Sequence, residues 1–155
     1  MFSLTSDDPM LSVIVQKPGL PKINVSKKSF LQSENDPWTP RDFFNLIKDI
    51  QDPELPQSLG ELEVVTEDRI TLDADNTVRI DFTPTVPHCS MATFIGLAIR
   101  VKLLHCLPHK FKVRVGVTEG SHDSAESITK QLADKERVAA AIENTALTES
   151  IFALY

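Results

Sequence analysis

Cysteine, glycine and long apolar runs are all scarce in this chain, and each scarcity excludes a class of protein. Its only two cysteines, Cys89 and Cys106, are too few for a disulfide framework, so a reducing compartment is expected. No run of about 18 apolar residues exists, which argues against a membrane span. The first residues lack the basic and apolar stretches of a secretory signal. The five glycines are scattered and form no phosphate-binding loop.

Positive charge is also in deficit. The 155 residues include 16 Lys and Arg against 22 Asp and Glu, which gives a net charge of −6. A protein that binds nucleic acid typically presents a basic surface, so we do not expect nucleic acid as a partner. Hydrophobic residues make up 41% and charged residues 25%, which is ordinary for one globular domain of this length.

The first 38 residues differ in composition from the remainder. They contain four of the ten prolines, and their four lysines cancel four acidic side chains, so the whole charge of −6 falls on residues 39–155. Segments of this kind bury little apolar surface. We therefore expect a disordered or weakly ordered tail over 1–38 and a folded domain over 39–155.

The hydrophobic pattern of residues 39–155 predicts a small α+β domain. The Thr39–Pro40 pair is typical of a helix start, and Asp52–Pro53 of a helix stop. A short turn at 73–76 implies an antiparallel hairpin. We expect a short, mainly antiparallel sheet packed against helices. The expected elements, in the order α-β-β-α-β-α, are a helix from 40 to about 52, strands at 63–72 and 77–82, a buried helix at 90–106, a strand at 111–117 and a last helix that restarts at Asp134 and ends near Asn144.

Cys89 lies between the end of a predicted strand and the start of the buried helix. Helix N-termini present unpaired amides and a partial positive charge, which favour a thiolate and lower the pKa of a cysteine. His88 adds positive charge when protonated, and Ser90 and Thr93 add hydroxyl groups. This pattern indicates a soft-metal ligand or a nucleophile. A small capping residue with an inert thiol fits the same pattern.

The two cysteines are not expected to act together within one chain. If 90–106 is one helix, Cys89 and Cys106 are separated by 17 residues, or about 25 Å at the rise of an α-helix. That exceeds the reach of a disulfide. A homodimer with exchanged elements would bring them together and is left open. His105, Cys106 and His109 resemble half of a zinc site, but no second half exists, so surface histidines are the favoured interpretation.

Two further clusters of charge could take part in binding. Asp52 and Glu54 flank a proline in one loop, which is typical of a polar helix stop, although a binding role is open. The mixed charges of 134–137 predict a solvated helix face, with an interaction surface as the alternative.

Several longer motifs together resemble one family. They are Asp52-Pro53-Glu54, Glu61-Leu62-Glu63-Val64-Val65, the segment Phe82 to Thr93, and the segment Lys130 to Ala141. In this order they are similar to the subunit family of the cytosolic iron–sulfur assembly (CIA) targeting complex. These Galla-like proteins share a domain with the bacterial proteins SufT and PaaD. The resemblance covers about residues 40–150, and the motifs at 100–103, 106–108 and 119–122 favour the branch linked to maturation of iron regulatory protein.

The resemblance implies a non-enzymatic adaptor that helps to deliver iron–sulfur clusters to apo-proteins such as iron regulatory protein. It places the functional thiol, and a metal ligand if there is one, on Cys89, and the acidic loop on Asp52 and Glu54. No tightly bound cofactor is implied, only a transient cluster whose other ligands come from elsewhere. The implied partners are a WD-repeat propeller subunit, a HEAT-repeat adaptor and apo client proteins, in the cytoplasm and also the nucleus.

Two other functions stay open on the residues alone. A cysteine-dependent transferase or redox enzyme would use Cys89 as its nucleophile, with a base beside it. A pure scaffold would use Cys89 only structurally.

Overall fold

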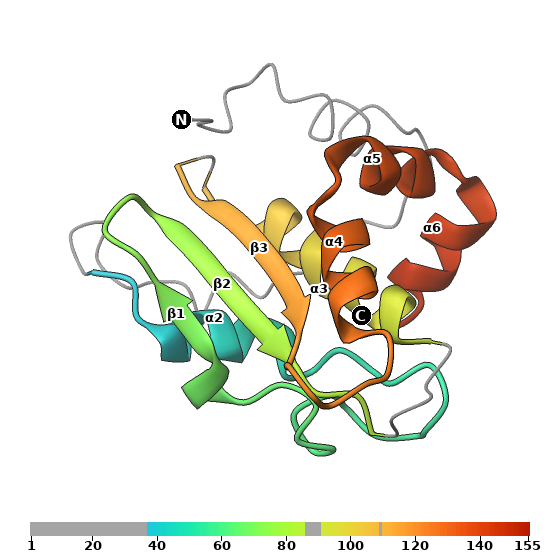
Figure 1. The fold of residues 1–155 in the computed structure, drawn as a ribbon, viewed down its shortest axis with the longest axis horizontal. Coiled ribbons are helices and arrows are strands. Elements are labelled where there is room, and N and C mark those ends of the chain that lie inside the picture. Colours follow the sequence, from blue (N-terminus) through green and yellow to red (C-terminus); the bar gives the residue numbers. More distant parts are fainter. Residues whose placement is uncertain (1–36, 86–90, 109) are drawn as a thin grey trace.

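A computed structural model describes residues 37–85, 91–108 and 110–155. The elements follow one another as helix, two strands, helix, strand and three helices. Figure 1 shows α2 and α3 behind the sheet, with α4, α5 and α6 beyond its β3 edge. The α+β class is confirmed, and the order of the elements agrees with the prediction up to the last predicted helix, where the structure has three helices. Within the described ranges, no helix is long and apolar enough to cross a membrane.

The first helix, α2 (Pro40–Ile47), starts where the sequence predicts. The Asp42 carboxylate accepts the N–H of Thr39 at 2.8 Å, which satisfies an amide at the helix start. The helix ends earlier than the expected stop before Pro53. After Ile47 the carbonyls of Lys48 and Ile50 accept hydrogen bonds from a later loop, from the amides of Gly60 and Leu59, instead of from the next helical turn.

Within the described residues the sheet has three strands in the order β1-β2-β3: β1 (Ile70–Leu72), β2 (Thr77–Phe82) and β3 (Lys112–Val117). The predicted antiparallel hairpin is present as β1 and β2. The expectation of a mainly antiparallel sheet is wrong, because β2 and β3 pair in parallel over their whole length. The connection between them contains a complete helix, the crossover that parallel neighbours need.

The first strand is shorter than the predicted range 63–72. The 3-10 helix η2 (Glu67–Arg69) precedes it, and Glu63 has a positive φ of 56°. Val64 and Val65 are buried in turns, where their amides donate to the carbonyl of Leu59. The β-branched residues of this segment therefore indicated core packing and not a long strand.

The central helix α3 (Ala92–Cys106) is buried along most of its length, as predicted. It packs between the sheet, α2 and the C-terminal helices. Aromatic rings from three parts of the chain meet at the core. Trp38 stacks on Phe43 at 5.3 Å between centroids and meets the edge of Phe111 at 5.4 Å.

The C-terminal part forms three short helices, α4 (Ala125–Ala133), α5 (Lys135–Glu143) and α6 (Thr145–Phe152). The carboxylate of Asp134 accepts hydrogen bonds from the amides of Glu136 and Arg137 and so begins α5. A helix that restarts at Asp134 was predicted. Asn144 ends α5 and also begins α6 by accepting the amide of Leu147. The helix α6 extends the helical part beyond the predicted end at Asn144.

Candidate functional site

The predicted thiol site is only partly within the described residues. His88, Cys89 and Ser90 lie outside them. Thr93 is half-buried in the first turn of α3, so it sits at the helix start that the sequence predicts. The role of this segment stays a prediction.

The start of α3 has the electrostatic character that favours an anion. The helix begins after Met91, whose side chain makes no capping hydrogen bond, and its first turn contains no acidic residue. The amide of Ile95 donates to the carbonyl of Met91 at 2.9 Å, which begins the helical ladder. First-turn amides have no partner inside a helix and give its N-terminus a partial positive charge. A thiolate near this end would be stabilised.

The two carboxylates of the acidic loop occupy different environments. Asp52 is buried, and its Oδ1 accepts the amides of Glu54 at 2.7 Å and Leu55 at 2.9 Å. Its own amide donates to the carbonyl of Gln57 at 2.9 Å. Glu54 is exposed. Asp52 therefore organises the loop, while Glu54 lies on the surface where a partner can contact it.

Leu55 lies beside Glu54 and is 40% exposed, more than any other large hydrophobic side chain of the described residues. A single exposed leucine is common on protein surfaces, so Leu55 does not by itself identify a contact with another protein.

The opposite end of α3 is built around Cys106. Burial raises the pKa of this thiol, while the nearby Lys102 ammonium lowers it less. The Lys102 ammonium lies 5.2 Å from the centre of the Tyr155 ring, and the Tyr155 hydroxyl donates to the carbonyl of Ala98 at 2.6 Å. These contacts join the C-terminus to α3, so Cys106 has the environment of a packing residue.

The described residues do not support a zinc site at this end of α3. His105 meets the edge of Phe152 at 6.4 Å between ring centres, and burial lowers its pKa. His109 lies outside the described residues. In the part of the chain that the structure describes, no group of three or more His, Cys, Asp or Glu is arranged to hold a metal ion.

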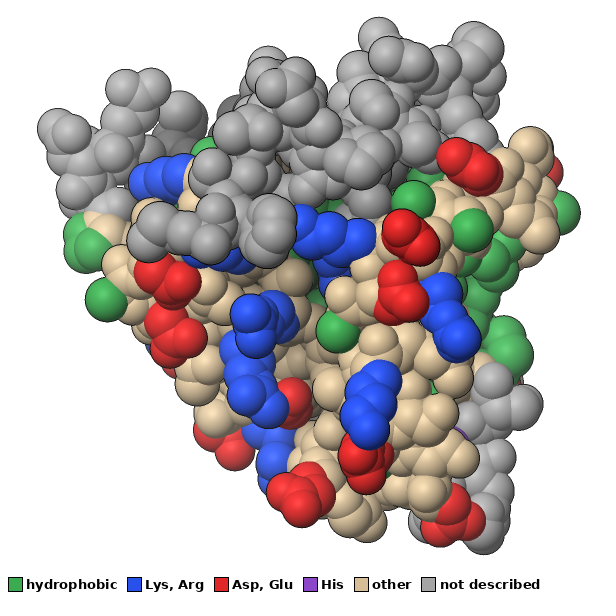
Figure 2. Space-filling model, turned by 45° about the horizontal axis from the view of Figure 1, so that its top comes forward, with side chains coloured by type: hydrophobic (Ala, Val, Ile, Leu, Met, Phe, Trp, Pro, Cys, Tyr) green, Lys and Arg blue, Asp and Glu red, His purple; other side chains and the backbone are tan. Residues whose placement is uncertain are grey.

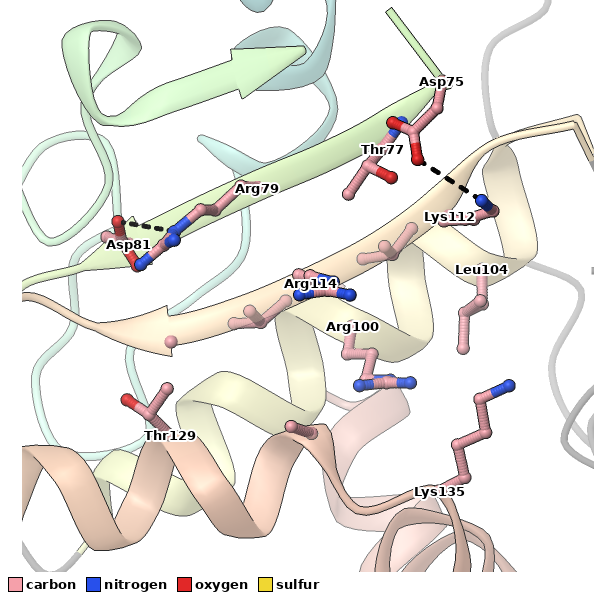
Figure 3. Close-up of a pocket in the computed structure, with 14 residues that line it drawn as sticks. Asp75, Thr77, Arg79, Asp81, Arg100, Leu104, Lys112, Arg114, Thr129 and Lys135 are labelled. Carbon is pink, nitrogen blue, oxygen red and sulfur yellow. Dashed lines mark hydrogen bonds and ion pairs between the residues drawn. The ribbon is translucent and has the colours of Figure 1, made fainter. Parts of the chain in front are cut away.

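A groove of about 590 Å³ lies along β3, and charged side chains stand among the apolar ones that line it. Sequence analysis did not predict this groove. Its walls are β2 and β3 on one side and the junction of α4 and α5 on the other, with α3 behind (Figure 3). The charged side chains that line it are five cations and two carboxylates, a net charge of +3: Arg79, Arg100, Lys112, Arg114, Lys135, Asp75 and Asp81. Figure 2 shows Lys and Arg side chains gathered across the middle of one face, with acidic side chains on both sides.

Each of the two carboxylates of the groove already forms an ion pair with a cation of the groove. Asp75 lies 3.4 Å from the Lys112 ammonium, and Asp81 lies 3.4 Å from the Arg79 guanidinium. A hydrogen bond from Thr77, with the charge of Lys112, lowers the pKa of Asp75. No acidic side chain forms an ion pair with Arg114 in the described parts of the chain, and the groove keeps an excess of positive charge.

Sequence alone gave only a partial signal for this groove. Arg79 and Arg114 lie in the strands predicted at 77–82 and 111–117, and the parallel pairing that places them directly opposite each other was not predicted. Arg100 lies in the helix predicted at 90–106; it is 6% exposed and donates through Nη1 to the carbonyl of Leu132.

Comparison with known proteins agrees with the resemblance found in the sequence motifs. A family described as "Iron-sulfur cluster assembly protein" matches residues 40–117. The Drosophila melanogaster MIP18 family protein galla-2 is 60% identical over 117 residues, 75% of each chain. The Mus musculus cytosolic iron-sulfur assembly component 2B is 57% identical over 112 residues, 72% of this chain and 69% of the mouse protein. Arabidopsis thaliana protein AE7 is 54% identical over 111 residues, 71% of each chain.

The family match includes the motifs at Asp52-Pro53-Glu54 and 61–65, and it extends through the crossover that joins β2 to β3. The family covers half of the chain, and each of the three relatives covers more than two thirds of it. The chain therefore belongs to the MIP18 family of iron–sulfur cluster assembly proteins.

Proposed function

We propose that this protein is a non-enzymatic adaptor of cytosolic iron–sulfur protein assembly, which helps to deliver clusters to apo-proteins. The observation that supports this most directly is its 57% identity with a mouse protein named as a component of cytosolic iron–sulfur assembly. Its own folded domain would present surfaces to other proteins, in the cytoplasm and also in the nucleus. The predicted tail over 1–38 lies outside the described residues up to position 36 and stays a prediction there, whereas Trp38 packs against the folded domain.

Cys89 is the proposed functional thiol, with His88, Ser90 and Thr93 shaping its surroundings. The support is the start of α3, which has no acidic residue in its first turn and no capping bond from Met91. Such a helix end stabilises a thiolate, and a thiolate binds iron. One cysteine cannot fill the ligand positions of a cluster, so the cluster is a transient cargo held jointly with thiols of a client, a partner or a second protomer.

The proposed partners are the WD-repeat propeller subunit of the CIA complex, the HEAT-repeat adaptor and the apo clients. The acidic loop is the proposed contact with one of them. Its support is the buried Asp52, which holds the loop, and the exposed Glu54 and Leu55 beside it. A preordered loop loses little conformational freedom on binding.

The thiol is tested in cells depleted of this protein and supplied with Cys89→Ala. We expect the variant to fold and to retain its propeller partner, but to restore less than about a tenth of client maturation, because the helix-end thiolate is lost. The measurements are aconitase activity of iron regulatory protein and activity of a second iron–sulfur enzyme. Cys106→Ala is the matched control, since it removes a half-buried thiol at the other end of the same helix.

Each outcome decides a separate part of the proposal. Full rescue by Cys89→Ala would remove this thiol from the mechanism and leave a scaffold. Purification of the tagged full chain without a WD-repeat propeller would overturn the adaptor role. The motifs at 100–103 and 119–122 favour the branch linked to maturation of iron regulatory protein. This assignment would be contradicted if the HEAT-repeat adaptor co-purified with the chain and if depletion of the chain impaired maturation of other clients. If the purified protein converted a small molecule and the Cys89→Ala variant did not, an enzymatic function would be favoured instead.

A further inference from the structure

Among the described residues, no strand pairs with the outer edge of β3. The amides of Lys112 and Thr118 donate toward β2, to the carbonyls of Asn76 and Phe82 at 2.9 Å each. Since amide directions alternate along a strand, those of Val113, Val115 and Val117 point away from β2. The amide of Val117 donates to Thr129 Oγ1 of α4 at 3.0 Å, which confirms this direction.

Two outward amides remain, those of Val113 and Val115. Within the described ranges no hydrogen bond is made to either amide from outside the sheet. Both residues line the groove between β3 and the α4–α5 junction, so their outward backbone faces its open space. A strand edge of this kind accepts an extended chain as an additional strand.

The cations of the groove determine which chain fits this edge. Arg79 and Arg114 are direct neighbours in the parallel register of β2 and β3, and like charges opposite each other destabilise a sheet. Arg79 has Asp81 as a partner, whereas no ion pair of Arg114 exists among the described residues. A carboxylate brought beside Arg114 would relieve this repulsion. Figure 3 shows Arg114 on β3 and Arg100 on α3 at the same hollow.

We propose that this groove is a docking site for an extended, acidic segment of a partner protein, which pairs with β3 as a fourth strand. Its carboxylates alternate along the segment and lie beside Lys112 and Arg114. The residues between them face Arg100 and Leu104, which line the same groove. A chain with a net charge of −6 does not attract long polyanions, so the positive groove favours a short acidic segment of a protein over nucleic acid. This interface is independent of Cys89.

The test uses the full chain and a seven-residue peptide with blocked ends in which glutamate and threonine alternate. Binding is measured by fluorescence anisotropy, and amide hydrogen exchange is measured with and without the peptide. We expect slower exchange at the amides of Val113 and Val115. We expect Arg114→Glu to weaken binding by about tenfold or more. The matched control Arg41→Glu makes the same change of charge on an exposed residue of α2 and should change affinity by less than about twofold.

A peptide methylated at alternate backbone nitrogens keeps every charge and loses the hydrogen atoms needed for strand pairing. It should bind at least about tenfold more weakly than the parent peptide. Equal binding of the methylated peptide would overturn the strand-pairing proposal, as would equal losses in Arg114→Glu and Arg41→Glu. Inorganic polyphosphate that competes as well as the peptide would reassign the groove to phosphate. Dimers that dissociate in Arg114→Glu, seen by light scattering, would reassign it to a second copy of the chain.

Discussion

Asp52 is a residue whose structural role and proposed role in binding can be separated. Its carboxylate lies below the surface and accepts two amides of its own loop, while Glu54, two residues later, lies on the surface. A side chain that caps a turn contributes through its acceptor oxygen, which an amide oxygen in the same place can replace in large part. A loss of function on changing Asp52 would therefore not by itself identify a contact with a partner.

We expect Asp52→Ala to lower the free energy of unfolding by about 1 kcal/mol, because two loop amides lose their acceptor and water replaces it only in part. Asp52→Asn keeps an oxygen in the same place and should recover most of this loss. Urea denaturation measures both. Glu54→Gln is the control at the surface and should leave stability unchanged while weakening the contact with a partner. Equal stability of the alanine and asparagine variants would show that the hydrogen bonds are not what holds the loop.

The helix α3 depends on close packing at Gly96. A Cβ atom built there lies closer than van der Waals contact to Leu132 Cδ1 in α4, and 3.1 Å from Phe82 Cε1 in β2. All three residues are in the buried core. The absence of a side chain at Gly96 therefore lets α3, α4 and the sheet meet at one point, where the carbonyl of Leu132 also accepts Arg100.

We expect Gly96→Ala to lower the free energy of unfolding by about 1–3 kcal/mol, the usual cost of overpacking a core. Helix propensity acts in the opposite direction by about 1 kcal/mol, so the net loss falls toward the lower end of that range. Adding Leu132→Ala should make the two changes less than additive, because the methyl group introduced in place of the Gly96 hydrogen would enter the space that Leu132 vacates. Thermal unfolding of the two single variants and the double variant measures this. Strict additivity would contradict the packing explanation.

The elements that were predicted correctly are those with local signals. Thr39 and Asp42 fix the start of α2, and Asp134 fixes the start of α5 through hydrogen bonds within a few residues. The parallel pairing of β2 with β3 was missed because it depends on a long crossover that contains a helix, not on a turn. The early end of α2 was missed because it also depends on residues distant in sequence. The amides of Leu59 and Gly60, in a later loop, bind the carbonyls that follow the last turn of α2.

At the scale of the whole molecule, charge and family membership were easier to predict than the basic groove. The net charge of −6 is a property of composition, and the motifs around Asp52 and Cys89 are contiguous in sequence. The groove is assembled from two strands and three helices that are distant in sequence, so its cations meet only after folding. An acidic protein can therefore contain a basic site that its composition conceals.

The contact of the C-terminus with α3 should set the alkaline limit of stability. Burial raises the pKa of Tyr155 above its usual value of 10 and that of Cys106 above 9. Both groups are neutral when protonated, so their contribution is fully present below these values and is lost as pH rises through the folded-state pKa. Lys102 has the opposite effect, because burial lowers its pKa and the folded state releases that proton more readily.

We therefore expect the free energy of unfolding to fall from about pH 9 to about pH 11, as the unfolded chain ionises groups that the fold keeps neutral. Tyr155→Phe should lower the free energy of unfolding by about 1 kcal/mol near neutral pH, because the hydrogen bond to the carbonyl of Ala98 is lost. At high pH the free energy of unfolding of this variant should fall less steeply than that of the native chain. The double variant with Cys106→Ala should have the shallowest slope, since Lys102 acts in the opposite sense. Urea unfolding midpoints at several pH values measure these slopes. Parallel slopes for all three proteins would mean that the C-terminal contact does not control alkaline unfolding.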